Sequence, residues 1–84
     1  MYRKIDNSPH MTMHEAFDLY PDEYILMQMD ESYMLNPAGF ILYVGDDGGE
    51  LFSLQVDLPV ERGIVFEGSN IQLRHSLGGI VVGS

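Results

Sequence analysis

The 84-residue chain has no cysteine and contains only four lysine and arginine residues. Without cysteine it can form neither a disulfide, a thiolate nucleophile nor a cysteine-based zinc site. So few basic residues make too small a positive surface to bind nucleic acid. A chain without disulfides suits a reducing compartment, and we expect a cytoplasmic protein.

Long apolar runs are also missing. The longest, Phe40-Ile41-Leu42-Tyr43-Val44, is much shorter than a membrane span, and the N-terminus lacks the apolar stretch of a signal peptide. We therefore expect no membrane partner.

What the chain has in excess is negative charge. It carries 13 Asp and Glu residues and a net charge of -9, and no Lys or Arg lies between Ile5 and Glu61. Such a field repels phosphates and attracts cations or basic protein surfaces. The hydrophobic content of 45% is normal for a globular domain and too high for a disordered acidic tail.

Residues 1–11 show no periodicity, and we predict that they form a flexible leader. The Ser8-Pro9-His10-Met11 junction resembles the remnant of an expression vector. Residues 12–84 are predicted to form a single α+β domain.

A short helix is predicted to begin at Thr12, because Thr12 and Glu15 have the spacing of a capping box. Met13, Ala16, Phe17 and Tyr20 follow at the spacing of one helix face, and Pro21 disfavours helical geometry at the residue before it, which ends the element.

Two strands, at residues 23–30 and 40–44, are predicted to pair antiparallel around an irregular excursion at residues 31–36.

Residues 50–58 fit either a strand or a helix by pattern. The spacing of Asp47 and Glu50, together with Pro59 just after the segment, favours a helix. Such a helix would be a crossover to a strand at residues 63–67, making that strand parallel to the one at 40–44. A closing hairpin is predicted from residues 71–75 and 80–82.

These elements together predict an α+β fold, with a mixed sheet of four to five strands and two helices packed on one face.

The segment Glu15-Ala16-Phe17-Asp18-Leu19-Tyr20-Pro21-Asp22-Glu23-Tyr24-Ile25-Leu26, then Ile41-Leu42-Tyr43-Val44-Gly45-Asp46 and Glu50-Leu51, resembles a group of small bacterial α+β proteins that form a domain of unknown function. In that group a helix leads into a Tyr-Pro-Asp-Glu-Trp/Tyr strand motif, and a later strand ending in Gly-Asp precedes a helix containing Glu-Leu. The similarity covers residues 13 to about 68. It implies a helix at residues 47–57 and no catalytic residue.

Several clusters have the composition of a chemical site. A metal could be bound by His10, Met11, Met13 and His14 with Met27 and Met29, or by Asp46, Asp47 and Glu50. Acid–base chemistry could use the pairs Asp22/Glu23 and Asp30/Glu31, and His10, His14 and His75 are the available imidazoles. For each cluster core packing, capping or solvation is the favoured interpretation. Gly45, Gly48 and Gly49 lack the Lys and Ser/Thr of a phosphate-binding loop. Arg62 and Arg74 are expected to offset nearby acids.

We therefore assign no catalytic, cofactor-binding or metal-binding residue. The sequence favours a non-enzymatic protein-interaction module that binds another protein or a second copy of itself as a homodimer, with residues 80–82 as a candidate edge strand. The alternative is an acidic antagonist, similar to an antitoxin, that binds a basic protein surface. A small metal-dependent enzyme is the third hypothesis.

Overall fold

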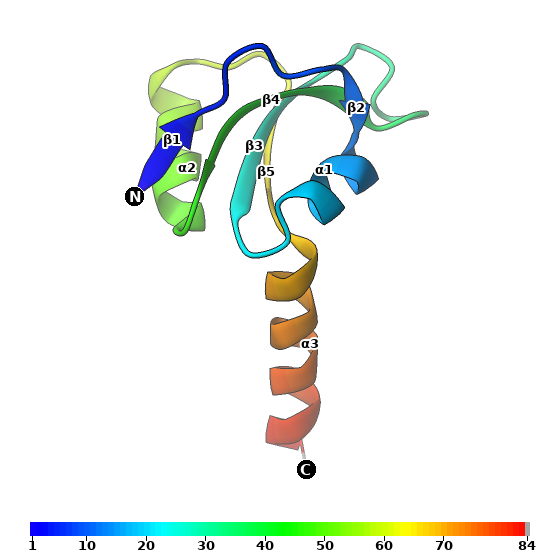
Figure 1. Cartoon of the computed structure of the whole chain (residues 1–84), viewed down its shortest axis with the longest axis vertical. Coiled ribbons are helices and arrows are strands. Elements are labelled where there is room, and N and C mark those ends of the chain that lie inside the picture. Colours follow the sequence, from blue (N-terminus) through cyan, green and yellow to red (C-terminus); the bar gives the residue numbers. More distant parts are fainter. Residues whose placement is uncertain (84) are drawn as a thin grey trace.

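The computed structural model describes the backbone of residues 1–83 and the side chains of residues 1–76. It has the predicted α+β fold (Figure 1). The elements are β1 (Tyr2–Lys4), β2 (Met11–Thr12), α1 (Met13–Leu19), β3 (Tyr24–Met29), β4 (Ala38–Gly45), α2 (Gly48–Asp57), β5 (Gly63–Glu67) and α3 (Ser69–Gly83).

Both predicted helix starts are confirmed. The Thr12 hydroxyl accepts a hydrogen bond from the Glu15 amide while the Glu15 carboxylate accepts one from the Thr12 amide, which is a complete capping box. The Asp47 carboxylate accepts hydrogen bonds from the amides of Gly49 and Glu50 at the start of α2. The ambiguous segment at residues 50–58 is therefore helical.

Every hydrogen-bonded strand pair in the sheet is antiparallel, in the order β1-β4-β3-β5, and β2 also pairs with β4. The predicted hairpin of β3 and β4 is confirmed. The expectation of a mixed sheet is corrected: β4 and β5 do run in the same direction, as a helical crossover requires, but β3 lies between them. The two strands on either side of a helical crossover need not be neighbours in the sheet.

Residues 1–11 were expected to form a flexible leader outside the domain, and this expectation is wrong, because the segment pairs with the sheet. Tyr2–Lys4 pairs with β4, and Met11 pairs with Gly39 farther along the same strand. Between them, the Ile5 amide donates to the Leu42 carbonyl and the Ser8 hydroxyl accepts from the Ile41 amide. The segment satisfies the backbone groups on the outer edge of β4, which would otherwise be exposed.

The predicted closing hairpin is also wrong, because Ser69–Gly83 forms α3 and residues 80–82 are not a strand. The helix begins where the amides of Asn70 and Ile71 donate to the Pro21 carbonyl and the Gln72 amide donates to the Gly68 carbonyl. The alternation that suggested a strand does not mark a buried face, since Ile71 is buried and Leu73 is exposed.

The helices α1 and α2 lie on opposite faces of the sheet, and not on one face as predicted (Figure 1). Ile25, Met27 and Met29 form a core cluster with Ala16 of α1. The side chain of Leu26 points to the other face, because successive residues of a strand alternate. That face is covered by α2, whose Leu51 is fully buried.

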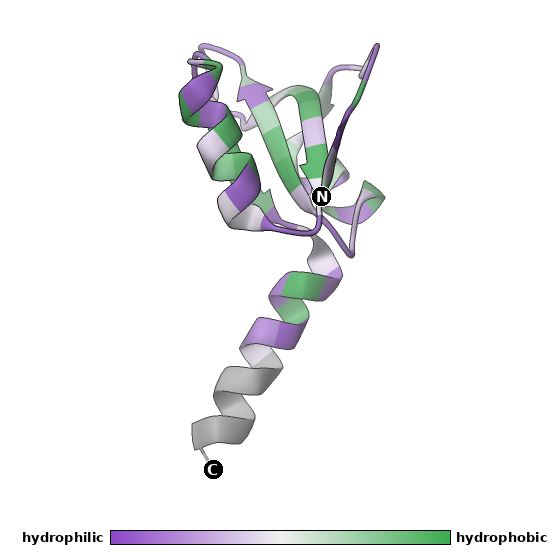
Figure 2. Ribbon diagram, turned by 90° about the vertical axis from the view of Figure 1, so that its left-hand side faces the viewer, coloured by the Kyte–Doolittle hydropathy of each residue, from purple (hydrophilic) through white to green (hydrophobic). Residues whose placement is uncertain are grey.

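Figure 2 shows the first turns of α3, residues 69–76, leading away from the sheet and the other two helices. Among the helices of residues 1–83, none combines the length and apolar character needed to cross a bilayer.

Candidate functional site

The α2 face of the sheet is not covered along its whole length. Gln28 on β3 pairs with Phe40 on β4 and with Gly63 on β5. The ring of His10, next to β2, contacts the ring of Phe40 edge to face, with centroids 5.2 Å apart. These four residues form a row across the sheet, in which Gly63 is contacted by Gln55 near the end of α2 and Phe40 is exposed.

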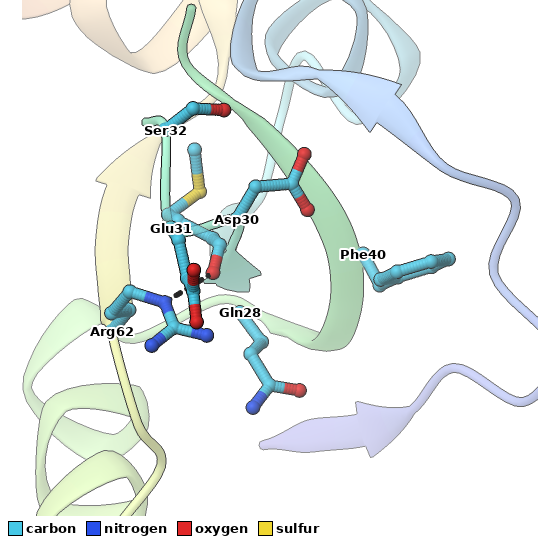
Figure 3. Close-up of a pocket in the computed structure, with 7 residues that line it drawn as sticks. Gln28, Asp30, Glu31, Ser32, Phe40 and Arg62 are labelled. Atoms are coloured by element: carbon cyan, nitrogen blue, oxygen red, sulfur yellow. Dashed lines mark hydrogen bonds between the residues drawn. The ribbon is translucent and has the colours of Figure 1, made fainter. Parts of the chain in front are cut away.

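An open hollow of about 670 Å³ lies over this row (Figure 3). It is lined by side chains from the end of β3, the excursion after β3, β4 and the residue before β5. These residues are Gln28, Met29, Asp30, Glu31, Ser32, Phe40 and Arg62.

Asp30 is held in place at one side of the hollow. Its amide donates to the Ala38 carbonyl, which closes the β3–β4 ladder. Its carboxylate oxygen Oδ2 lies 2.7 Å from Nε2 of His10 and is hydrogen-bonded to it. The bond fixes the carboxylate beside Phe40 while the imidazole remains half exposed.

The one cationic side chain in the hollow is already engaged. Arg62 Nε donates to the Met29 carbonyl at 3.0 Å, and its Nη1 lies 2.7 Å from the Glu61 carboxylate. Its φ angle of 53° is in the left-handed region that favours glycine. The side-chain bonds offset the strain of that backbone conformation.

Charge and shape at the hollow favour a cationic ligand. The carboxylates of Asp30 and Glu31 line the hollow, and the guanidinium group of Arg62 pairs with a third carboxylate, that of Glu61. Phe40 is 44% exposed, which is high for an aromatic side chain in the second strand from a sheet edge. An exposed aromatic ring next to carboxylates can bind a Lys or Arg side chain by its stem and its charge together.

The structure does not bring the three histidines together. His14 pairs with Asp18 one turn later in α1, at 3.5 Å, and His75 contacts the Glu67 carboxylate. Met11, Met27 and Met29 belong to the buried core, whereas His10 is half exposed and bonded to Asp30. In the part of the chain that the structure describes, no three His, Cys, Asp or Glu side chains converge as a metal site requires.

The acidic turn before α2 has structural partners. Asp47 caps the helix, and the N-terminal ammonium of Met1 lies 2.5 Å from Asp46 and 3.1 Å from Glu50. These contacts raise the pKa of the Met1 ammonium and lower the pKa of Asp46, because each ion stabilises the charged form of the other.

The glycines around this turn allow close packing. A Cβ atom on Gly45 would lie 2.9 Å from the Met1 carbonyl oxygen, and one on Gly48 would lie 2.8 Å from the Tyr24 ring. Gly49 is less crowded.

The remaining acid pair, Asp22 and Glu23, is also partnered. Arg3 makes a bidentate contact with Glu23, at 2.6 and 2.9 Å. Asp22 accepts from the Asn70 amide group and lies 3.5 Å from Arg74. The expectation that Arg62 and Arg74 offset nearby acids is confirmed.

Sequence reasoning singled out Asp30, Glu31 and Arg62 but missed Gln28, Ser32 and Phe40 as residues of one site. They belong to separate elements, and only the register between β3, β4 and β5 places them together. An informative signal was present in Phe40, since strand alternation places it opposite to the buried Gly39 and Ile41.

No protein-family model matches this chain, and neither a curated protein nor a solved structure shows significant similarity to it. The resemblance to the small bacterial α+β proteins therefore stays a prediction.

Proposed function

We propose that this chain is a non-enzymatic protein-interaction module whose hollow binds a positively charged segment of another polypeptide. The observation that carries the proposal is the exposed ring of Phe40 in the same hollow as the carboxylates of Asp30 and Glu31. The net charge of -9 supports it, because a negative field speeds the encounter with a basic partner.

In this arrangement a Lys or Arg side chain lies along the Phe40 ring. Its cationic end reaches the carboxylates of Asp30 and Glu31, and the Gln28 amide accepts a further hydrogen bond. A cation–π contact at an exposed site contributes about 0.5–1 kcal/mol. The carboxylates are solvated, so their contribution is screened by salt, and binding is expected to weaken as the salt concentration rises.

The test uses synthetic peptides rich in Arg or in Lys, with binding followed by fluorescence anisotropy at low and high salt. Phe40→Thr keeps a strand-forming residue and removes the ring, and we expect affinity to fall roughly two- to fivefold. Glu31→Gln removes one charge, and we expect weaker binding together with a smaller salt dependence.

Asp18→Asn is the matched control for charge, because Asp18 lies on α1, on the opposite face of the sheet. It changes the net charge by the same amount as Glu31→Gln and should leave affinity nearly unchanged. Equal losses in the two variants would show that only net charge matters. Failure of both peptides to bind at low salt would refute the proposal.

Self-association is the second candidate function. The sequence predicted self-association through an edge strand at residues 80–82, but these residues do not form a strand. Another strand, β5, has an open edge, which gives self-association a different structural basis.

A further inference from the structure

The sheet has two outer edges, at β1 and at β5, and β5 is the longer of these two strands. In the pairing with β3, the Met29 amide donates to the Arg62 carbonyl and the Gly68 amide donates to the Glu23 carbonyl. Backbone groups on an antiparallel strand point alternately to one neighbour and to the other side. Arg62, Ile64, Phe66 and Gly68 therefore face β3, while Gly63, Val65 and Glu67 face outward.

The chain itself covers the first of these outward positions. The Gly63 amide donates to the Val60 carbonyl, and the Gly63 carbonyl accepts from the Gln55 side-chain amide at 2.5 Å. Neither bond would form if the backbone groups of Gly63 pointed to β3. The two bonds therefore support the conclusion that Gly63, Val65 and Glu67 face outward. For Val65 and Glu67, no hydrogen bond from the outward amide or carbonyl to another described residue is seen.

From this pattern we infer that two copies of this chain pair through their β5 edges, antiparallel, with the two-fold axis at Phe66. In this register Val65 of each copy lies opposite Glu67 of the other. The amide and carbonyl of both residues are then all satisfied, giving four hydrogen bonds between the copies. The inference is independent of the proposed binding of a basic segment.

Neighbouring registers satisfy fewer groups. An axis at Val65 pairs Val65 with itself but places Glu67 opposite Gly63, whose backbone groups are already bonded. An axis at Glu67 places Val65 opposite Ser69, which begins α3 and is no longer extended. The capped Gly63 and the start of α3 thus leave an open edge that fits its own copy best in a single register.

Side chains near the axis favour a second copy over a basic strand. Phe66 faces the α1 side, where it lines an apolar hollow of about 320 Å³ together with Met13, Phe17 and Pro37. The two Phe66 rings would lie side by side at the axis, since directly opposed residues without mutual hydrogen bonds have the closest side chains. His14 and Gln72 also line each hollow, and the joined surface has no carboxylate in this lining to pair with a Lys or Arg side chain.

The net charge of -9 on each copy opposes this association. Pairing through one short strand also buries little area, so the dimer should be weak and concentration-dependent. Salt screens the repulsion between the copies and should strengthen the dimer, which is opposite to its effect on the binding of a basic peptide. Failure of the dimer and failure of the proposed function are therefore distinguishable.

The experiment measures mass by sedimentation from micromolar to millimolar concentration, at low and high salt. We expect the mass to rise toward twice the 9.5 kDa of the monomer, at lower concentration when salt is high. A strictly monomeric mass over the whole range would overturn the inference.

Hydrogen exchange of the unaltered protein identifies the edge. The amides of Val65 and Glu67 should become protected as concentration rises, whereas those of Ile64 and Phe66 should be protected throughout, because they bond to β3. A dimer that forms without protecting Val65 and Glu67 would contradict the proposed edge.

A substitution gives an independent test. Val65→Pro removes an outward amide, and edge positions of this kind tolerate proline. The variant should stay folded and monomeric. Ile64→Pro is the matched comparison: it removes an amide that faces β3 and should unfold the domain. A Val65→Pro protein that still dimerises would also refute the inference, and if it fails to fold, the exchange measurement decides.

Discussion

Gly39 lies so close to the backbone of β3 that a Cβ atom added to it would come 2.0 Å from the Gln28 carbonyl oxygen and 2.8 Å from the Met29 Cα. Gly39 pairs with Met29 on one side and with Met11 on the other, and it is buried. The backbone of the hairpin cannot keep its present path with any larger residue at this position.

Gly39→Ala is therefore expected to destabilise the domain by about 1–3 kcal/mol, the usual range for overpacking of a buried site. Chemical denaturation followed by circular dichroism measures the change.

Gly49→Ala is the matched control. Gly49 is exposed in the first turn of α2, and its nearest neighbour would be the Asp47 carboxylate oxygen at 3.3 Å. Because alanine favours a helix over glycine, this variant should be neutral or more stable by up to about 1 kcal/mol. A Gly39→Ala protein as stable as Gly49→Ala would contradict the close approach of β4 to β3.

The packing of α2 on the sheet predicts unequal effects of two adjacent substitutions. Leu51 is fully buried and Phe52 is 60% exposed. Leu51→Ala should cost about 2–5 kcal/mol, because it leaves a cavity between α2 and the sheet. Phe52→Ala should cost less than about 1 kcal/mol despite the larger side chain removed. Similar losses in a urea titration would mean that this helix does not pack as described.

The cap of α2 can be tested by removing one carboxylate. Asp47→Ala leaves the amides of Gly49 and Glu50 without their acceptor, and stability should fall by about 0.5–2 kcal/mol. Asp47→Asn keeps an acceptor oxygen and should recover most of the loss. If Asp47→Asn is as unstable as Asp47→Ala, the carboxylate acts by its charge and not as a cap.

The capping box of α1 makes stability depend on pH. Hydrogen bonds from the amide and hydroxyl of Thr12 lower the pKa of Glu15 below its ordinary value of 4.5. Since the folded pKa is below the unfolded one, the stabilisation is complete above the unfolded pKa and is lost as pH falls through the folded pKa. Nuclear magnetic resonance titration of the Glu15 carboxyl should therefore show a midpoint below 4.5.

Thr12→Val removes the hydroxyl with little change in shape and should move that midpoint upward. An unchanged midpoint in Thr12→Val would show that the hydroxyl does not contribute to the shift.

The sequence predicted the elements that depend on near neighbours. Thr12 and Glu15 form their capping box three residues apart, and Pro21 ends α1 after Leu19. The choice of a helix at residues 50–58 was correct because Asp47 and Pro59 mark its two ends, although the apolar pattern was ambiguous.

Predictions that depended on distant pairing were less accurate. The sequence left the order of the strands open, and the pairing of residues 1–11 and the face covered by each helix differ from what the pattern suggested. The alternation of Ile71 and Leu73 was read as a strand, but these residues lie in a helix. Alternation alone does not show whether a sheet has a free edge at which such a strand could pair. The hollow around Phe40 was missed because its residues lie on separate elements, which only the register of β3, β4 and β5 brings together.

The amino-acid sequence by itself determined the acidity of the surface, the absence of cysteine chemistry and the positions of most helices and strands. Capping bonds, proline geometry and hydropathy act over a few residues, so their effects can be predicted from the sequence alone. Only the tertiary structure decided that β3 lies between β4 and β5, that α1 and α2 cover opposite faces, and that Val65 and Glu67 face outward. Those features depend on which backbone edges remain unpaired after all other segments have packed.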